Sequence, residues 1–265
     1  MRWLSHLLLA CLAMTDALLP LPLPWKNHAN AELPDYCESE PLGLTGTLNK
    51  GLIDGLKGAI DVAYAERDIP RFFVLETLAR VPYFSYLSCL HLYESLGMRG
   101  NARLMRLHYA EADNELHHLL IMESLGGGDA YADRFIAQHL AFVYYWYCVA
   151  LYLVNPRAAY HLSELVEEHA YHTYDQYLTA HAAELKQQEV PEVARRYYEG
   201  HDAMRTLLTD AAPGAKSARP KRLSSLYDVF LCVRDDEAAH WDTLVNLVSY
   251  DSPDTPEGCE ILELA

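Results

Sequence analysis

The chain has 265 residues, of which 51% are apolar and 22% are charged, a balance typical of a folded globular protein rather than a disordered one. Its formal net charge of −16 argues against a nucleic-acid partner, because phosphate binding requires a concentrated basic surface. Six cysteines without a CxxC pair or a regular spacing argue against a disulfide framework or a zinc site, so we expect buried free thiols.

The N-terminal segment resembles a targeting leader. A short basic start precedes an apolar stretch at residues 7–14, and small residues follow at Ala29 and Ala31 in an Ala-x-Ala pattern. The pattern leaves open whether the segment is removed. The expected division of the chain is a leader at 1–31, a helical domain at 32–250 and a loose acidic tail at 251–265.

From residue 49 onward the sequence predicts helices separated by short breakers. No stretch alternates with a period of two for long enough to predict a strand, so an all-α fold is expected. Gly126, Gly127 and Gly128 mark a helix end, and Pro82 is expected to bend a helix without ending it. The predicted helices span residues 52–66, 70–96, 102–125, 131–154, 158–186, 191–209 and 225–249.

The motif E-x-x-H occurs on two of these helices, as Glu115 with His118 and as Glu237 with His240. Residues three positions apart share a helix face, so both side chains of each pair can reach one metal ion. One such motif is usually a salt-linked pair on the surface of a helix. Two copies on separate helices make half of a di-iron carboxylate site.

The other half of such a site is a single glutamate from each of two further helices. Glu76 lies among apolar residues on the second predicted helix, and Glu167 lies on the fifth. Carboxylates and imidazoles hold iron while leaving coordination positions open for O2. The expected fold is therefore a ferritin-like four-helix bundle with a di-iron core and additional short helices.

Four stretches of the sequence resemble the alternative oxidase family, and within it the plastid terminal oxidase branch. They are residues 71–84, 114–123, 160–174 and 233–240. The resemblance covers roughly residues 60 to 250. It implies a non-haem di-iron quinol oxidase that transfers electrons from plastoquinol to O2 and releases water.

The resemblance also assigns the iron ligands and their supporting residues. Glu168 competes with Glu167, but the family's carboxylate precedes a tyrosine by seven residues, and Tyr174 stands at that distance from Glu167. By the same resemblance Tyr174 supports redox chemistry or proton delivery, and Asn114 and Asp236 orient ligands. The implied ligands of the two iron ions are Glu76, Glu115, His118, Glu167, Glu237 and His240.

The implied site for the quinol head group lies close to these ligands. Leu75 and Ala170 are expected to wall an apolar slot beside Glu76, and Arg71 and Thr173 to donate hydrogen bonds to the quinone oxygens.

Residues 140–154 form an unbroken apolar and aromatic run that is shorter than the roughly 20 residues of a membrane-spanning helix. Together with the apolar face of residues 72–93, this run is interpreted as a surface embedded in one membrane leaflet. Core packing or a dimer face would use the same residues. We expect a homodimer on the stromal face of a plastid thylakoid, with the mitochondrial inner membrane as the alternative.

Three other functions remain compatible with the sequence. A mitochondrial-type ubiquinol oxidase would differ in substrate preference and targeting. A di-iron hydroxylase or desaturase would release an oxygenated or unsaturated product. An iron-storage protein would assemble into a soluble shell, which the aromatic run contradicts.

Overall fold

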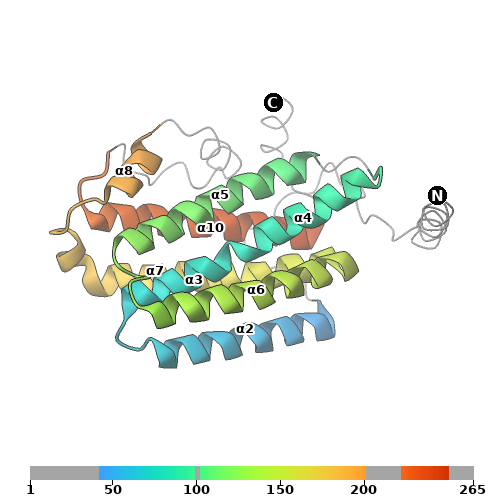
Figure 1. Cartoon of the computed structure of the whole chain (residues 1–265), viewed down its shortest axis with the longest axis horizontal. Coiled ribbons are helices and arrows are strands. Elements are labelled where there is room, and N and C mark those ends of the chain that lie inside the picture. Colours follow the sequence, from blue (N-terminus) through green and yellow to red (C-terminus); the bar gives the residue numbers. More distant parts are fainter. Residues whose placement is uncertain (1–41, 99–101, 201–221, 251–265) are drawn as a thin grey trace, which may run out of the picture.

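The computed structural model describes residues 42–98, 102–200 and 222–250, so the predicted leader and tail lie outside the described residues. Within these ranges every regular element is a helix and no strand occurs, which confirms the predicted all-α class (Figure 1). The helices are α2 (Gly43–Ala63), α3 (Asp68–Ala79), α4 (Val81–Ser95), α5 (Ala102–Ser124), α6 (Tyr131–Val154), α7 (Pro156–Leu185), α8 (Glu192–Glu199) and α10 (Leu226–Tyr250).

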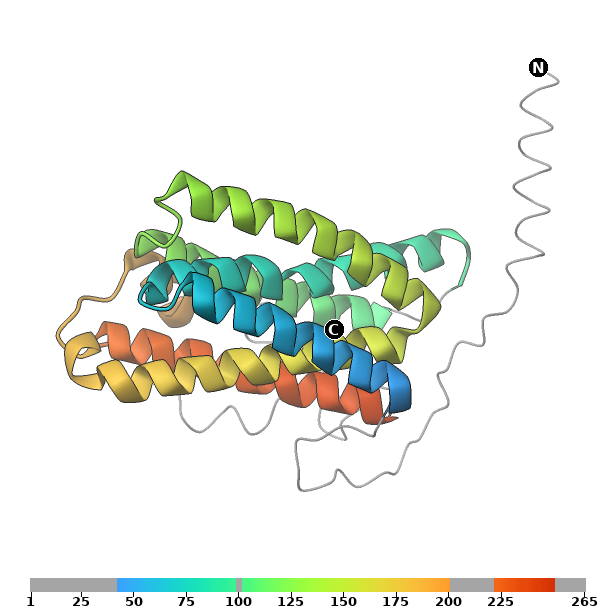
Figure 2. The ribbon, with the colours of Figure 1, turned by 90° about the horizontal axis from the view of Figure 1, so that it is seen from below.

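The long helices run side by side along the molecule's longest axis (Figures 1 and 2). Helices α7 and α10 pack along each other, while α3 and α4 lie between α5 and α6. Helix α2 packs against α7 on the outside of the bundle. Helices α2 and α6 have 21 and 24 residues, close to the 23 of α5 and the 25 of α10, whereas α8 has eight.

Helix α2 begins at Gly43, well before the predicted start at residue 52. The segment is rich in glycine, which lowers the intrinsic helix propensity and hides the element from local sequence patterns. A tertiary contact holds it: the buried Asn49 amide donates a hydrogen bond to the carbonyl of Ala158 at 2.8 Å. Contact with α7, rather than local preference, therefore fixes the start of α2.

The disturbance predicted at Pro82 takes the form of a one-residue interruption at Arg80, whose backbone angles (φ −65°, ψ −21°) remain helical. Helix α3 ends at Ala79, and α4 begins at Val81 with Pro82 in its first turn, where proline's missing N–H removes no helical hydrogen bond. The single helix predicted at 70–96 is therefore divided at Arg80 into two helices, while the backbone stays helical between them. The helix predicted at 191–209 is α8, which ends at Glu199; residues 201–221 lie outside the described part.

Glycines determine how α3 meets the end of α5. Gly126 adopts a φ of 87°, a left-handed conformation that ends α5 as the sequence predicted. At Gly127 an added Cβ would lie 2.7 Å from the Cβ of Phe73 and 2.9 Å from the carbonyl oxygen of Ile69. This close approach brings α3 against α5 and positions the residues that follow Phe73.

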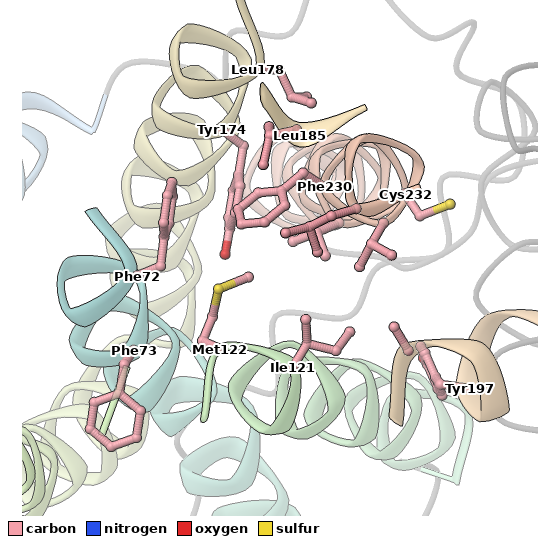
Figure 3. Close-up of a cluster of buried hydrophobic side chains, with 14 of the residues drawn as sticks. Phe72, Phe73, Ile121, Met122, Tyr174, Leu178, Leu185, Tyr197, Phe230 and Cys232 are labelled. Carbon is pink, nitrogen blue, oxygen red and sulfur yellow. The ribbon is translucent and has the colours of Figure 1, made fainter. Parts of the chain in front are cut away.

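Two buried clusters fill the bundle. In the first, Phe72 stacks on Tyr174 with ring centroids 4.4 Å apart, and Phe230 meets Phe72 edge-on at 5.6 Å (Figure 3). The second is rich in buried tyrosines from α4, α6 and α7. The predicted buried free thiols are confirmed at Cys89 and Cys148.

Helix α6 presents large apolar side chains to the outside. The exposed fractions are 67% for Phe142, 67% for Val143 and 56% for Trp146. At 24 residues, the whole helix is longer than the run noted in the sequence and is apolar enough to cross a membrane by length and composition. Only 17% of its most apolar window is buried inside the protein.

Residues 72–93 contribute much less to this outer surface than expected. Their large apolar side chains are mostly buried, and within this stretch Leu92 is the one that is exposed. The reason is that α5 and α6 cover α3 and α4 on opposite sides. That part of the predicted membrane surface was wrong.

Candidate metal centre

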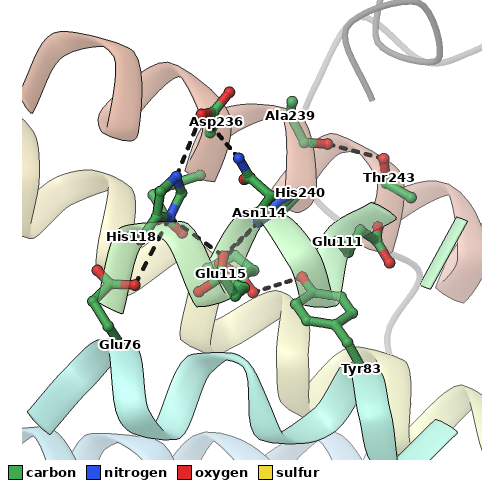
Figure 4. Close-up of polar contacts among 12 residues, drawn as sticks. Glu76, Tyr83, Glu111, Asn114, Glu115, His118, Asp236, Ala239, His240 and Thr243 are labelled. Carbon is green, nitrogen blue, oxygen red and sulfur yellow. Dashed lines mark hydrogen bonds and ion pairs between the residues drawn. The ribbon is translucent and has the colours of Figure 1, made fainter. Parts of the chain in front are cut away.

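Six acidic and imidazole side chains from four helices converge in the middle of the bundle. Each E-x-x-H motif presents both of its side chains inward, on α5 and on α10, and α3 and α7 each add one glutamate. Every one of the six is at most 2% exposed. They are the six residues that the sequence singled out: Glu76, Glu115, His118, Glu167, Glu237 and His240. Figure 4 shows how Glu76, Glu115, His118 and His240 converge.

One half of the centre surrounds His118. Glu76, Glu115, His118 and Glu237 each offer a ligand atom, and these four atoms lie within 4.8 Å of one another. The Nδ1 atom of His118 is 2.9 Å from Glu237 Oε1, 3.7 Å from Glu115 Oε1 and 3.8 Å from Glu76 Oε2. This geometry fits one metal ion.

The other half surrounds His240. Glu115, Glu167, Glu237 and His240 form a second group whose ligand atoms also lie within 4.8 Å of one another. His240 Nδ1 is 2.8 Å from Glu115 Oε1 and 3.9 Å from Glu167 Oε2. Because Glu115 and Glu237 belong to both groups, they are placed to bridge two adjacent ions.

The rival acid Glu168 belongs to neither group and is partly exposed, whereas Glu167 is fully buried. The spacing to Tyr174 therefore selected the residue that points into the cluster.

Most carboxylate oxygens of the cluster lack a hydrogen-bond donor within the described protein. Buried carboxylate oxygens normally accept hydrogen bonds or bind cations, because an unpaired buried charge is strongly unfavourable. Apart from the ion-pair contacts with His118 and His240 described above, six oxygens of four buried glutamates have no hydrogen-bond donor among the described residues. They are Glu76 Oε2, both oxygens of Glu115, Glu167 Oε2 and both oxygens of Glu237.

The pKa values of the metal-free cluster reflect the same crowding of negative charge. Burial, followed by repulsion from Glu115, raises the pKa of Glu76 and of Glu237 well above the ordinary value. Burial alone would lower the pKa of His240, but its contacts with Glu115 and Glu167 raise it to about 10. Without a metal the cluster therefore holds protons that cations would displace.

The donor set fits two divalent cations. Four carboxylates offset the charge of two such ions, and one imidazole nitrogen faces each half of the site. Two E-x-x-H helices with one further glutamate from each of two other helices form the donor pattern of di-iron and di-manganese carboxylate proteins.

Hydrogen bonds outside the cluster orient His118. Its Nε2 atom lies 3.3 Å from Asp236 Oδ2, which also accepts hydrogen bonds from Asn114 Nδ2 at 3.2 Å and from the Tyr198 hydroxyl at 2.8 Å. Asn114 Nδ2 also donates to the hydroxyl oxygen of Tyr197 at 2.6 Å. The expected orienting positions, Asn114 and Asp236, thus contact each other, while the two tyrosines of α8 were not anticipated.

Two further tyrosines contact the cluster itself. The Tyr174 hydroxyl donates a short hydrogen bond to Glu76 Oε1, next to the predicted position of the quinol. The Tyr83 hydroxyl donates to Glu167 Oε1 at 2.6 Å. Sequence reasoning missed Tyr83 because its partner lies 84 residues away on another helix.

An apolar cleft opens beside Glu76. Leu75, Glu76, Ala170 and Tyr174 line it, so the cleft reaches a carboxylate of the cluster and the tyrosine bonded to it. Helix α2 supplies much of the opposite wall. Outside α3, the wall also contains residues that the sequence did not assign to the quinol site. They are Ile53, Leu56, Lys57, Ile60, Tyr144, Val166 and His169.

Arg71 and Thr173 do not line this cleft. Arg71 forms an ion pair with Asp61 at 2.6 Å, and the Thr173 hydroxyl donates to the carbonyl of His169 at 2.8 Å. Of the four predicted quinol contacts beyond Glu76, the structure therefore places Leu75 and Ala170 in the wall.

Comparisons with known proteins all point to one family. Residues 36–248 match the family model of the alternative oxidases. A protein of Arabidopsis thaliana described as ubiquinol oxidase 4, chloroplastic/chromoplastic, is 47% identical over 225 residues, or 84% of this chain and 63% of the relative.

More distant relatives carry related descriptions. Alternative oxidase 3, mitochondrial, of Glycine max is 24% identical over 83% of this chain and 62% of its own length. A ubiquinol oxidase of Trachipleistophora hominis is 26% identical over 76% of this chain and 57% of its own length. The chain thus spans about three fifths of the length of these relatives, and its identity to the chloroplastic one is about twice that to the others.

Proposed function

Since the chain belongs to the alternative oxidase family, we propose that it is a non-haem di-iron quinol oxidase that oxidises plastoquinol and reduces O2 to water. Two quinols supply the four electrons and four protons that convert one O2 into two waters, so the reaction balances without another reductant. The higher identity to the chloroplastic relative favours plastoquinol over ubiquinol, which is the second candidate substrate. A hydroxylase, a desaturase and an iron-storage protein have no support from the family.

One observation carries the proposal: the apolar cleft ends on Glu76, which is also part of the buried cluster. A lipid-soluble reductant in this cleft would lie one side chain away from the metal centre. When bound, two iron ions would supply the redox chemistry that passes electrons to O2. The side chains proposed to hold them are Glu76, Glu115, His118, Glu167, Glu237 and His240.

The chain's own residues orient the ligands and hold protons. Asp236 fixes the ring of His118 through its Nε2 atom, and Tyr83 fixes Glu167. The Tyr174 hydroxyl stands between the cleft and Glu76 Oε1, where it can pass a proton released by the quinol toward the cluster. We assign proton transfer to the Tyr174 hydroxyl on this basis.

The quinol head group is proposed to lie against Leu75 and Ala170. Arg71 precedes Leu75 by one helical turn, and Thr173 follows Ala170 by three residues, so each shares a helix face with a wall residue. Arg71 remains a proposed hydrogen-bond donor at the edge of the head group. Thr173 donates its hydroxyl proton to the carbonyl of His169, so its oxygen is proposed to accept from a quinol hydroxyl.

Oxygen uptake tests the function and the cleft together. The iron-loaded protein should consume one O2 per two plastoquinols, insensitively to cyanide and without accumulating hydrogen peroxide. Ala170→Phe places a ring in the cleft, and we expect kcat/KM for quinol to fall by at least about tenfold with unchanged iron content. Ala180→Phe makes the same change at an exposed position of α7 and is the control.

No quinol-dependent uptake by the iron-loaded protein would contradict the proposed activity. Normal quinol kinetics in Ala170→Phe would contradict the position of the head group. Comparing plastoquinol with ubiquinol under the same conditions decides between the two candidate substrates.

We propose that the protein associates with one membrane leaflet through the outer face of α6. This face carries the exposed Phe142, Val143 and Trp146, and a quinol dissolved in the bilayer requires an enzyme at the membrane surface. Helix α6 also packs along α3, α4 and α7, so spanning the bilayer would pull the buried carboxylates into the hydrocarbon. The stromal face of the thylakoid is the proposed location.

Flotation with phosphatidylcholine vesicles tests this surface. The double variant Phe142→Glu/Val143→Glu should lose vesicle binding, since each apolar side chain removed from lipid costs about 1.5–3 kcal/mol and the added charge costs more. Gln187→Glu/Gln188→Glu adds the same charge at exposed residues near the end of α7 and should float like the wild type. Unchanged flotation of the α6 variant would contradict the proposal that this face of α6 binds the membrane. The proposed homodimer is tested separately, by the mass of the solubilised protein.

A further inference from the structure

A second group of titratable side chains lies deep in the tyrosine-rich cluster, apart from the metal centre. His108 and Glu111 come from α5, Tyr152 from α6 and Tyr160 from α7, and each is at most 1% exposed. His108 Nδ1 is 2.7 Å from Glu111 Oε2, and His108 Nε2 is 3.1 Å from the Tyr160 hydroxyl. The hydroxyls of Tyr152 and Tyr160 are 2.9 Å apart.

We take Glu111 as a carboxylate and His108 as a neutral imidazole, and the contacts then order the protons along the group. A carboxylate at Glu111 can only accept, so the Nδ1–H of His108 donates to it. The Nε2 atom of the neutral imidazole then accepts from the Tyr160 hydroxyl, whose oxygen accepts in turn from Tyr152. Tyr160 is therefore a phenol hydrogen-bonded to a base whose far side faces a carboxylate.

The group lies close to the metal centre along two helices. Glu111 precedes Glu115 by four residues, and Tyr160 precedes Glu167 by seven, a rise of about 10 Å. The ring of Tyr83 stands between them, 6.1 Å from the ring of His108 and 5.6 Å from that of His240. A short and continuous aromatic path thus joins Tyr160 to the centre.

We propose that Tyr160 is a reserve one-electron donor to the metal centre, used when O2 is reduced there before quinol has supplied enough electrons. In this step one electron leaves the Tyr160 ring for the oxidised centre, and its hydroxyl proton moves to His108 Nε2. The products are a neutral tyrosyl radical and an imidazolium paired with Glu111. When the next quinol electron reduces the radical, the proton moves back from His108 to the phenolic oxygen. The inference rests on the proposed oxidase function.

Charge explains why this tyrosine suits the role. Before the step the buried group carries the negative charge of Glu111, and afterwards the imidazolium balances it, which a low-dielectric interior favours. Glu111 Oε1 accepts no hydrogen bond from the described residues, so the carboxylate's charge is available to the imidazole. Burial raises the pKa of Tyr160 well above the ordinary value, so the phenol keeps its proton until an electron leaves.

Tyr86 offers a matched contrast in the same cluster. It is equally buried, and its ring centroid lies 5.4 Å from that of His108 and 5.1 Å from that of Tyr160. Its hydroxyl, however, contacts the carbonyl of Ala159 at 2.7 Å and Ser163 Oγ at 2.6 Å, neither of which is a base. Neither of these partners can take the proton of Tyr86.

Electron paramagnetic resonance of the full chain tests the proposal. Protein loaded anaerobically with ferrous iron is mixed with O2 without quinol and frozen rapidly, after growth with ring-deuterated tyrosine to identify a tyrosyl signal. We expect the radical in the wild type and in Tyr86→Phe, and its loss in Tyr160→Phe and in His108→Gln. In D2O, the wild-type radical should couple to two exchangeable deuterons, one on His108 Nε2 and one on the Tyr152 hydroxyl. Tyr152→Phe should remove the second coupling and keep the one from His108.

The outcomes separate the two proposals. Iron content and quinol-dependent O2 uptake are measured on the same samples, and failure of these in the wild type overturns the oxidase function itself. If both are normal, the absence of a tyrosyl radical in the wild type overturns the role of Tyr160. A wild-type signal in iron-loaded Tyr160→Phe overturns it too, and would assign the radical to another tyrosine such as Tyr174. If the variants fail to fold, the deuteron coupling in the wild type decides, and its absence counts against the proposal.

Discussion

Glu167→Gln is expected to abolish quinol-dependent oxygen uptake and to lower the iron content, whereas Glu168→Gln should leave both near the wild-type values. Glu167 contributes to the group around His240 and also accepts the hydrogen bond of Tyr83. An amide keeps the size of the side chain but removes the negative charge that a cation requires. We expect turnover to fall by at least about 100-fold, a loss of about 3 kcal/mol of transition-state stabilisation.

The neighbouring acid is a strict control for this experiment. Glu168 shares the local sequence, helix and charge of Glu167, but it belongs to neither group of converging atoms.

Glu115→Ala and Glu237→Ala remove the two carboxylates common to both groups and should also abolish uptake. An electrode trace with iron analysis measures the effect. Normal turnover in Glu167→Gln, or loss of iron in Glu168→Gln, would contradict the assignment.

Removing iron is expected to lower the melting temperature by about 10 °C. The metal-free cluster holds four glutamates with six oxygens that accept no hydrogen bond from the described residues, and cations remove this penalty. A ligand at 1,000 times its Kd stabilises the folded state by about 4 kcal/mol, and each kcal/mol shifts the melting temperature by about 2–4 °C in a protein of this size. Thermal scans with and without a chelator measure the difference.

The difference in melting temperature between iron-loaded and metal-free protein should depend on pH. In the metal-free protein the pKa values of Glu76 and Glu237 are raised by burial and by the neighbouring carboxylates, and that of His240 is raised to about 10. Groups with raised pKa values stabilise the fold below their unfolded-state pKa and lose that contribution as pH rises through the folded-state pKa. Metal-free protein should therefore melt progressively lower from about pH 5 to pH 9, since the unfolded carboxyls titrate near 4.3.

Glu167 does not offset this trend. Burial would raise its pKa, but contacts with His240 lower it, so its contribution changes with pH only below the ordinary carboxyl range. Iron binding requires deprotonated ligands and strengthens with pH. The gap between iron-loaded and metal-free protein should therefore widen toward alkaline pH. A constant gap, or a metal-free protein most stable at high pH, would show that these carboxyls do not share one crowded site.

Local signals in the sequence were sufficient to predict where most of the helices lie. The glycines after residue 125 end α5, and α6 has the predicted bounds. The start of α2 was missed because its glycine-rich segment is held by Asn49 against α7 rather than by its own propensity. Pro82 illustrates the opposite limit: the residue predicts a disturbance of the helix, but not that the interruption falls two residues earlier, at Arg80.

Four of the six converging side chains were predictable because helical spacing alone puts the acid and the imidazole of each E-x-x-H pair on one face. Glu76 was indicated by its apolar surroundings, and Glu167 was separated from Glu168 only by the family's spacing to Tyr174. The residues that orient them were less accessible. Tyr83 and the tyrosines of α8 reach the centre across helix interfaces, and no spacing within one segment reports such a contact. Arg71 and Thr173 show that the family resemblance does not predict which side chains line the cleft. Both lie on the expected helix faces but outside the cleft wall.

Helix α5 bears two acid–imidazole pairs on one stripe, His108 with Glu111 and Glu115 with His118. One extra or missing residue between them would swing one pair about 100° around the helix axis and leave the other in place. The number of residues from 108 to 118 is consequently as constrained as their chemistry. Evolution can exchange side chains along this stretch, but insertions and deletions there would uncouple the two pairs at once.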